Sequence, residues 1–248
     1  MKKMYKGAII AATLIMMNNN VVYAESFNNL SEVQSNIYEH LKNRDAQISF
    51  SYSGDTNEFK NELTNIIKAA LKEDDYTERS WIEIKPKADI SKNKAEATIN
   101  ITYLTTKAEE TYVESEIQKI VSQIIIPGMS DTDKIRAISD YLIGKLDYDY
   151  TFKSNNSYTA LTTGKCTCQG YSMTTYKLLT EAGFTNRIII GKFNNEPHSW
   201  NYVKIGDTWY HLDITNNDST RSDKYFLVGD DMMIQNNYYW NKVNYPQK

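Results

Sequence analysis

The chain has 248 residues, 41% of them hydrophobic, and a formal charge of −3 at pH 7. That length suits one domain of moderate size together with a smaller one. The charge balance is mildly acidic and no block of basic residues occurs, so nucleic acids and anionic lipids are not expected as partners. The chain holds only two cysteines, Cys166 and Cys168, which excludes the disulfide-rich class of small exported scaffolds.

The first 24 residues are typical of a secretory signal peptide. A basic start is followed by the apolar segment 7–17 and by a small-x-small sequence at 22–24. The apolar segment has about half of the roughly 20 residues that a membrane-spanning helix needs, and no longer apolar run follows it. We therefore predict a signal peptide over 1–24, no transmembrane segment, and a mature protein that is secreted or held at the cell surface.

The rest of the chain is expected to form an α+β accessory domain, 25–106, and a core domain, 107–248, that begins with a linker helix. In the accessory domain, apolar residues either recur at helical spacing or alternate with polar ones. This mixture favours a helix packed on a short antiparallel sheet. The expected elements are a helix over 30–42, a strand over 48–52, a helix over 59–71, a strand over 81–85, a turn from Pro86 to Lys94 and a strand over 95–103.

The core domain is expected to combine helices with an antiparallel sheet. Pro127-Gly128 should stop the linker helix, and Ser130 with Asp133 has the spacing of a capping box. The expected elements are a linker helix over 108–126, helices over 130–146 and 168–183, and strands over 188–190, 198–205, 208–215 and 225–228.

Cys168 stands where a helical pattern begins, which is a favourable place for a reactive thiol. A helix N-terminus favours a thiolate through its unpaired amide groups and the helix dipole. Gly170 permits a close approach of the backbone at this point. Cys166 lies on the loop side and has less reason to be activated. Cys168 is therefore the candidate nucleophile.

A histidine and an aspartate follow on two strands that residues 206–207 are expected to join as a two-residue hairpin turn. In that register Trp200 faces Asp213 and His198 faces Thr215, all on one side of the hairpin. His198 and Asp213 are then diagonal neighbours, with Cβ atoms somewhat under roughly 7–8 Å apart. Asp213 could orient the His198 ring, which would take a proton from the nucleophile. The three groups together predict nucleophilic catalysis on an acyl carbon.

Simpler interpretations stay open for each residue taken alone. His198 could be a surface histidine, and Asp213 could be a residue that ends a strand. His211 has the same strand parity and is interpreted as structural. The two cysteines could be incidental, a strained disulfide or a redox pair. A zinc site needs about four ligands, which the scattered histidines do not supply, so no metal or organic cofactor is predicted.

Three motifs together resemble the transglutaminase-like superfamily of bacterial secreted proteins. They are Cys168-Gln-Gly-Tyr-Ser, His198-Ser-Trp-Asn and Trp209-Tyr-His-Leu-Asp213-Ile-Thr. The resemblance extends over roughly 125–245, about half of the chain. It implies a papain-like core, in which a helix carrying the cysteine packs on an antiparallel sheet carrying the histidine and the aspartate.

The resemblance also implies roles for these residues. It makes Cys168 the nucleophile in preference to Cys166, His198 the base and Asp213 the orienting acid. Relatives often have Trp then Asp after the Asp-x-Thr sequence, whereas this chain has Asn-Asn-Asp at 216–218. That departure affects the loop beside the site and the fit of the substrate.

Residues near the motifs are candidates for the substrate cleft and for the oxyanion donors. The backbone amide of Cys168 is one natural donor. The side chain of Gln169 or Tyr158 could supply a second, and Tyr148 and Tyr150 remain open as alternatives. Trp200 is expected to line the cleft beside the histidine. The aromatic residues at 238–245 are interpreted as a packing layer rather than as a platform for peptide or sugar.

The predicted function is that of a secreted cysteine enzyme that forms an acyl-thioester on Cys168 from a protein or peptide amide. Hydrolysis, as in a peptidase or amidase, is favoured over crosslinking to a lysine amine. Cell-wall peptide is the substrate that analogy with other exported bacterial proteins suggests. The alternative is a non-catalytic surface binding or scaffold module that retains the fold.

Overall fold

In the computed structural model, which describes residues 25–246, the chain divides between Lys107 and Ala108 into two compact units. The predicted signal peptide, 1–24, lies outside the described residues. Within residues 25–246, no helix is both long enough and apolar enough to cross a bilayer. The two units are α+β in character, which confirms the predicted fold class.

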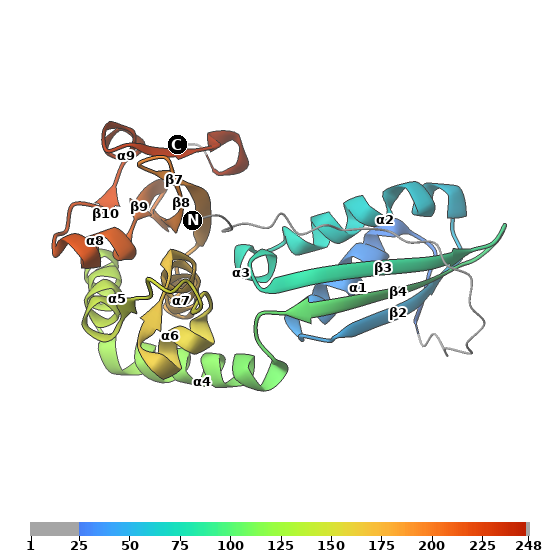
Figure 1. The fold of residues 1–248 in the computed structure, drawn as a ribbon, viewed down its shortest axis with the longest axis horizontal. Helices are drawn as coiled ribbons and strands as arrows, with labels where there is room; N and C mark the ends of the chain where they lie inside the picture. The colour runs from blue at the N-terminus through green and yellow to red at the C-terminus, as the bar shows by residue number, and fades with distance from the viewer. Residues whose placement is uncertain (1–24, 247–248) are drawn as a thin grey trace. The chain divides into compact units, whose positions relative to one another are not determined.

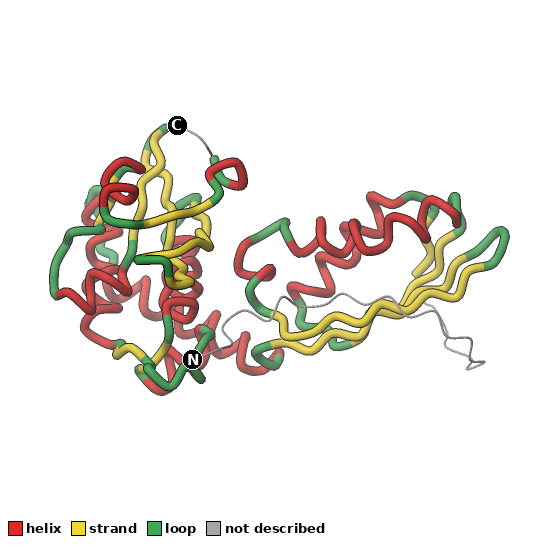
Figure 2. The backbone as a smooth tube through the Cα atoms, turned by 45° about the horizontal axis from the view of Figure 1, so that its top comes forward, coloured by secondary structure: helices red, strands yellow, loops and turns green. Residues whose placement is uncertain are grey.

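The N-terminal unit is a sheet with strand order β1-β2-β4-β3, covered on one face by helices α1 and α2 (Figures 1 and 2). Strand β1 runs parallel to β2, and the other neighbours are antiparallel. Its elements in chain order are β1 (Glu25–Phe27), α1 (Leu30–Lys42), β2 (Gln47–Tyr52), α2 (Thr56–Leu71), α3 (Asp75–Glu78), β3 (Trp81–Ile90) and β4 (Ala95–Tyr103).

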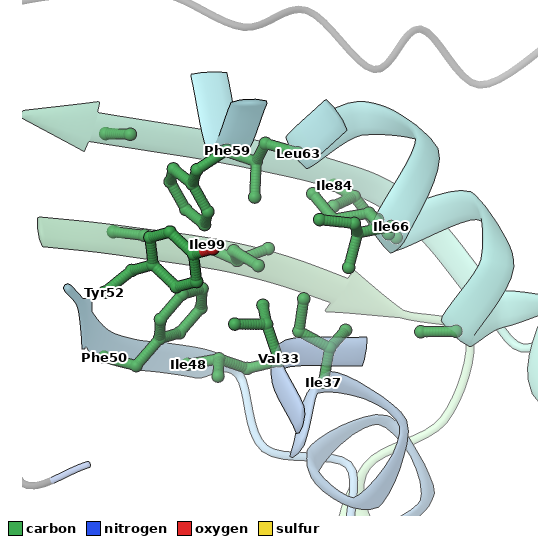
Figure 3. Close-up of a cluster of buried hydrophobic side chains, with 14 of the residues drawn as sticks. Val33, Ile37, Ile48, Phe50, Tyr52, Phe59, Leu63, Ile66, Ile84 and Ile99 are labelled. Atoms are coloured by element: carbon green, nitrogen blue, oxygen red, sulfur yellow. The ribbon is translucent and has the colours of Figure 1, made fainter. Parts of the chain in front are cut away.

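The helices of this unit form because capping residues precede amphipathic sequences. The side chain of Asn29 accepts a hydrogen bond from the Glu32 amide at the start of α1, and Asp55 caps α2 in the same way. The apolar faces of both helices and the inward residues of the strands then share one core. Figure 3 shows its side chains pointing into the same space, among them Val33, Ile37, Ile48, Phe50, Phe59, Leu63, Ile66, Ile84 and Ile99.

Strand β3 continues through Pro86 to Ile90, so the predicted turn beginning at Pro86 is wrong. Pro86 lies opposite Ile99 in the ladder with β4. It is tolerated because β3 stands at the end of the sheet order, where a residue without an amide proton leaves no neighbouring strand unpaired. The chain instead turns between Ile90 and Ala95.

The C-terminal unit is built on a sheet with strand order β10-β9-β8-β7-β11, and helix α7 packs on β7 and β8. All four pairings in this sheet are antiparallel. Its elements are α4 (Lys107–Ile124), α5 (Asp131–Lys145), β5 (Asp147–Tyr148), α6 (Ser157–Thr163), β6 (Lys165–Cys166), α7 (Cys168–Glu181), β7 (Asn186–Phe193), β8 (Glu196–Ile205), β9 (Thr208–Leu212), α8 (Ile214–Thr220), β10 (Phe226–Val228), α9 (Asp230–Gln235), β11 (Tyr238–Trp240) and the short 3₁₀ helix η1 (Lys242–Asn244).

Two local predictions in this unit are confirmed. Ser130 caps α5, with its hydroxyl accepting a hydrogen bond from the Asp133 amide at 3.1 Å. The turn at 206–207 joins β8 to β9 in the predicted register, in which Ile205 faces Thr208.

The predicted strand over 208–215 is wrong at its end, because β9 stops at Leu212 and α8 follows at once. The side chain of Asp213 caps that helix by accepting a hydrogen bond from the Asn216 amide at 3.0 Å. Aspartate is among the preferred residues at this position, and its capping ends the strand. The pairings expected between Trp200 and Asp213 and between His198 and Thr215 therefore do not form.

Candidate active site

Cys168 is the first residue of α7, as the sequence predicts. Its side chain is buried. At the start of a helix, the helix dipole and the unpaired amides of the first turn favour a thiolate. Gly170 is required here because a Cβ at that position would collide with the Cβ of Cys166, which packs against the first turn. The close packing of β6 on α7 thus fixes where the candidate nucleophile lies.

His198 and Asp213 meet in the interior although the hairpin does not pair them. The Nε2 atom of His198, on β8, lies 2.7 Å from Oδ2 of Asp213, at the cap of α8. Asp213 is completely buried and His198 is 7% exposed. Because α8 begins directly after β9, the aspartate reaches the histidine from a helix cap rather than from a strand.

The third contact joins His198 to Cys168. A hydrogen bond links the imidazole to the thiol, and a further one reaches the same sulfur from the side chain of Ser199. The backbone of Ser199 also hydrogen bonds to this sulfur. Since Nε2 of His198 faces Asp213, the ring nitrogen that remains for the sulfur is Nδ1. The structure therefore brings the sulfur, the imidazole and the carboxylate together in one chain of contacts.

The electrostatics of this chain favour a thiolate and an imidazolium. Burial alone would lower the pKa of His198, but the charge and hydrogen bond of Asp213 outweigh it and raise the pKa to about 10. Burial would raise the pKa of Cys168, yet the hydrogen bond and charge of His198 hold it below its ordinary value. Despite its burial, Asp213 has a lowered pKa because of the His198 charge. All three groups are thus set for proton transfer from sulfur to imidazole.

Trp200 does not line an open cleft, and that prediction is wrong. Its side chain is 1% exposed and stacks on the His198 ring, with centroids 5.8 Å apart and planes at 19°. Its indole nitrogen donates to Nδ1 of His211 at 2.9 Å. The face that Trp200 shares with His198 is directed into the core, so the tryptophan supports the imidazole from behind.

His211 has a structural position, as the sequence analysis expected. Besides its contact with Trp200, its Nε2 atom lies 3.1 Å from Oδ1 of Asp230. Asp230 in turn accepts a hydrogen bond from Lys242 at 2.7 Å. The Nδ1 atom of His211 therefore ties β9 to Trp200 of β8, and its Nε2 atom ties β9 to Asp230 of α9, which also holds Lys242.

The two oxyanion candidates occupy different surroundings. Gln169 follows the nucleophile on α7, and its side-chain amide lies 3.8 Å from the sulfur of Met173. Tyr158, on α6, packs edge-on against Tyr112 of α4 with ring centroids 5.6 Å apart. That contact gives Tyr158 a place in the packing between helices, whereas Gln169 remains a prediction for the oxyanion.

Cys166 is a buried, free thiol rather than half of a disulfide. Its burial, with smaller effects of neighbouring charges, raises its pKa far above the ordinary value. A thiol of this kind is a poor nucleophile at neutral pH. Among residues 25–246 no cluster of three or more histidine, cysteine or acidic side chains could hold a metal ion.

Three further residues surround the site that the sequence analysis did not single out for it. Ser199 contacts the sulfur of Cys168 as described above. Asn216 and Tyr238 donate hydrogen bonds to Oδ2 of Asp213 at 2.9 and 2.6 Å. The available signals were the position of Ser199 beside the histidine, the departure from the family pattern at 216–218 that includes Asn216, and the place of Tyr238 in the C-terminal aromatic cluster.

Comparison with known families matches residues 118–214 to the transglutaminase-like superfamily. The matched stretch includes Cys168, His198 and Asp213. The resemblance inferred from the motifs is therefore confirmed over residues 118–214. No curated protein sequence matches the chain.

Several solved structures are similar at low identity. A protein described as a TGase has 13% identity and a TM-score of 0.42, over 77% of this chain and 59% of its own. A candidate cysteine protease from Cytophaga hutchinsonii has 15% identity and a TM-score of 0.39, over 62% of each chain. A candidate protease from Parabacteroides distasonis has 6% identity and a TM-score of 0.33, over 52% of this chain and 39% of its own. The chain thus spans less than two thirds of the length of each of these proteins.

Proposed function

We propose that this protein is a thiol enzyme that attacks amide bonds of a protein or peptide through an acyl-thioester on Cys168. The observation that supports the proposal is the continuous contact from Cys168 through His198 to Asp213. Cys168 at the start of α7 is the proposed nucleophile, His198 in β8 the base, and Asp213 at the cap of α8 the residue that orients the base. The match of this region to the transglutaminase-like superfamily agrees with a thiol enzyme.

In the first half of the reaction the Cys168 thiolate attacks the amide carbonyl carbon, and a carbon–sulfur bond forms. Negative charge develops on the carbonyl oxygen, for which the backbone amide of Cys168 at the start of α7 is the proposed donor. The His198 imidazolium then gives its proton to the amide nitrogen as the carbon–nitrogen bond breaks. An amine leaves, and the acyl group remains on the sulfur as a thioester.

In the second half neutral His198 removes a proton from water, and the resulting hydroxide attacks the thioester carbon. The carbon–sulfur bond breaks, a carboxylic acid leaves, and the thiolate and imidazolium are restored. An amine acceptor would follow the same course and give a crosslink. We favour water because it needs no dedicated binding groups beside the site.

We also propose that the protein acts outside the cell, on the strength of the signal-like sequence at 1–24. Peptides of the cell wall are the substrates that such a location favours by analogy. The mechanism above does not depend on this choice, because it requires only an accessible amide.

The test is selective alkylation of the intact protein with iodoacetamide at about pH 6, followed by mass spectrometry of the two cysteine peptides. An ordinary thiol, with a pKa near 8.5, is well under about 1% ionised at that pH. Cys168 should therefore react at least roughly tenfold faster than an ordinary thiol, and His198→Ala should abolish the advantage. Equal, slow labelling of Cys166 and Cys168 would contradict the proposal.

A second measurement distinguishes hydrolysis from crosslinking. The protein is incubated with a peptide library, and the mass spectrum of the intact enzyme is searched for an acyl adduct on Cys168. A mass spectrum of the peptides from the same incubation shows whether they are cut or joined. The variant Cys168→Ala is the control, in which both the adduct and the products should disappear.

A further inference from the structure

The C-terminal strand β11 delivers a tyrosine to the buried end of the candidate site. Tyr238, its first residue, is completely buried, and its hydroxyl donates to Oδ2 of Asp213 at 2.6 Å. Its ring packs against Trp200 at 5.1 Å and lies 6.0 Å from the ring of His198. Tyr238 lies in the C-terminal segment of the chain, beyond the stretch 118–214 that matches the superfamily.

Asn216 completes a closed set of hydrogen bonds with this tyrosine. Its side-chain amide donates to Oδ2 of Asp213 at 2.9 Å and to the Tyr238 hydroxyl at 2.5 Å. Its backbone amide donates to the other carboxylate oxygen, Oδ1, at 3.0 Å. The hydroxyl of Tyr238 therefore accepts a hydrogen bond from Asn216 and donates one to Asp213. The hydroxyl proton and both protons of the Asn216 side-chain amide each have an acceptor.

Strand β11 is held in place by close packing as well as by its ladder with β7. Trp240 pairs with Gly191, and a Cβ at residue 191 would collide with the carbonyl oxygen of Tyr239. The amide of Ile190 also donates to the hydroxyl of Tyr245 at 2.9 Å. These contacts fix the distance between Tyr238 and the candidate site.

The consequence concerns how firmly His198 keeps its proton. Oδ2 of Asp213 receives hydrogen bonds from His198, Tyr238 and Asn216, so its negative charge is divided among three donors. When a buried carboxylate loses one of its hydrogen-bond donors, its negative charge interacts more strongly with the donors that remain. An imidazolium bound too strongly to Asp213 would be reluctant to protonate a leaving amine.

We infer that Tyr238, together with Asn216, is a positioning residue that orients Asp213 and shares its charge, and so sets the proton affinity of His198. The inference rests on the proposed function, because it concerns the same nucleophile and base. Burial and the Asp213 charge raise the pKa of Tyr238 far above its ordinary value, so the hydroxyl stays protonated and remains a donor. The titratable groups that face His198 are Cys168, Asp213 and Tyr238, whose ring lies 6.0 Å from the imidazole. Tyr238 also donates a hydrogen bond to Asp213.

The experiment uses the full chain and compares iodoacetate with iodoacetamide as reagents for Cys168 over about pH 5 to 12, a range that extends beyond the raised pKa of His198. Iodoacetate carries a negative charge, so the imidazolium of His198 attracts it, and its rate should fall when His198 loses its proton. Iodoacetamide is neutral and should not show that fall. The alkaline limb of the iodoacetate profile therefore reports the titration of His198.

In Tyr238→Phe the ring packing is kept and one donor to Asp213 is lost, so the alkaline limb should move to higher pH by roughly half to one unit. Tyr225→Phe is the matched control. Tyr225 is also buried, and its ring packs against Tyr238 at 5.1 Å. Its replacement should leave the limb in place. Asn216→Ala removes the other side-chain donor to Oδ2 and should shift the limb in the same direction, which keeps the test valid if Tyr238→Phe does not fold.

The outcomes separate this inference from the proposed function. If wild-type Cys168 reacts as an ordinary thiol with both reagents, the proposed function fails and the inference fails with it. If the wild type shows the bell-shaped iodoacetate profile but both variants superimpose on it, only the inference is overturned. A shift to lower pH in a folded variant, or an equal shift in Tyr225→Phe, overturns it as well.

Discussion

At the residue scale, the exchange of a proton between Cys168 and His198 links their titration to folding. In an unfolded chain the histidine titrates near about pH 6.5 and the cysteine near about pH 8.5. In the folded chain the pKa of His198 is raised to about 10 and that of Cys168 is lowered. In the part of the range between about pH 6.5 and 8.5 that lies above the folded-state pKa of Cys168, both states therefore hold one proton on this pair. There the pair adds no pH dependence to the free energy of unfolding.

Outside that window the two contributions no longer cancel. Stabilisation by a raised histidine pKa is complete below about pH 6.5 and is lost as the pH rises toward 10. Stabilisation by a lowered cysteine pKa is complete above about pH 8.5 and is lost as the pH falls. The pair thus predicts a plateau of stability at neutral to mildly alkaline pH.

Replacing Cys168 by Ala should remove the plateau. Only the histidine contribution then remains, since Asp213 still raises the pKa of His198. The free energy of unfolding of Cys168→Ala, relative to wild type, should fall between about pH 6.5 and 8.5 with a slope of up to about 1 kcal/mol per pH unit. Urea unfolding at several pH values across this window measures the slope.

Cys166→Ala is the control for this experiment, because the Cys166 thiol is buried with a raised pKa and stays protonated in the folded chain. Its replacement can lower stability through a cavity but should leave the slope in this window unchanged. Parallel curves for wild type and Cys168→Ala would show that no proton has moved from sulfur to imidazole.

The sequence was sufficient to predict Cys168, His198 and Asp213 as neighbours, but not how they meet. The helix start and the turn at 206–207 are local signals, and the structure has both. Strand parity placed Trp200 on the same face as His198, but it could not tell that this face points into the core. Tyr238 escaped prediction because its place depends on the docking of β11, some forty residues beyond the histidine, against β7.

At the element scale, the position of α7 depends on its close packing against β6. Gly170→Ala would place a Cβ against the Cβ of Cys166. Overpacking of this kind costs about 1–3 kcal/mol, which should exceed the gain of about 1 kcal/mol from replacing glycine in a helix. Gly170→Ala should therefore lower the midpoint of urea unfolding and slow the alkylation of Cys168.

Gly144→Ala is the matched control for that change. Gly144 also lies in a helix, α5, and a Cβ there meets nothing within 4 Å. The variant should be as stable as the wild type or more so, with unchanged alkylation of Cys168. If both alanine variants behave alike, the contact between α7 and Cys166 does not hold the nucleophile in place.

The loop between β5 and α6 is a second element on which the site depends. Asp149 accepts hydrogen bonds from the amides of Lys153 and Ser154 and from both the amide and the hydroxyl of Thr151. These bonds, that of the Thr151 hydroxyl foremost, hold the pKa of Asp149 well below its ordinary value. The carbonyl of Ser154 then receives the amide of Thr167, the capping residue of α7.

Removing this carboxylate should open the loop. Tyr150 and Phe152 are exposed by 78% and 48%, so a protease that cuts after aromatic residues can reach them once the backbone is free to move. Asp149→Ala should therefore be cleaved by chymotrypsin at these residues much faster than the wild type. Asp147→Ala, an exposed aspartate in the neighbouring strand β5, is the control and should resist cleavage as the wild type does. Equal cleavage of both variants would contradict this role for Asp149.

Element types were predicted better than element ends, for a physical reason. Helices α1, α2 and α5 have caps and apolar faces that are visible locally. Whether Pro86 ends a strand depends instead on whether that strand lies at the edge of its sheet, which only the assembled sheet decides. Helices α6, α8 and α9 span seven residues or fewer, too few for a hydrophobic period to show.

At the scale of the whole molecule, the two units bury separate sets of apolar side chains. The core of the N-terminal unit is drawn from residues 33–101, and the two core clusters of the C-terminal unit are drawn from 113–214 and 189–238. No residue of one unit appears in a buried cluster of the other among residues 25–246. A unit with its own core can in principle fold alone.

The fragment 108–248 should therefore fold by itself and keep the candidate site, because it contains Cys168, His198, Asp213 and Tyr238 with the elements that carry them. It should unfold in a single cooperative transition in urea. Its Cys168 should react with iodoacetamide at about pH 6 within roughly a factor of two of the full chain, since the contacts that lower the thiol pKa come from this unit alone. The same fragment with His198→Ala is the control and should lose the reactivity. An unfolded fragment, or a folded one whose Cys168 labels like an ordinary thiol, would show that residues 25–107 help to form the site.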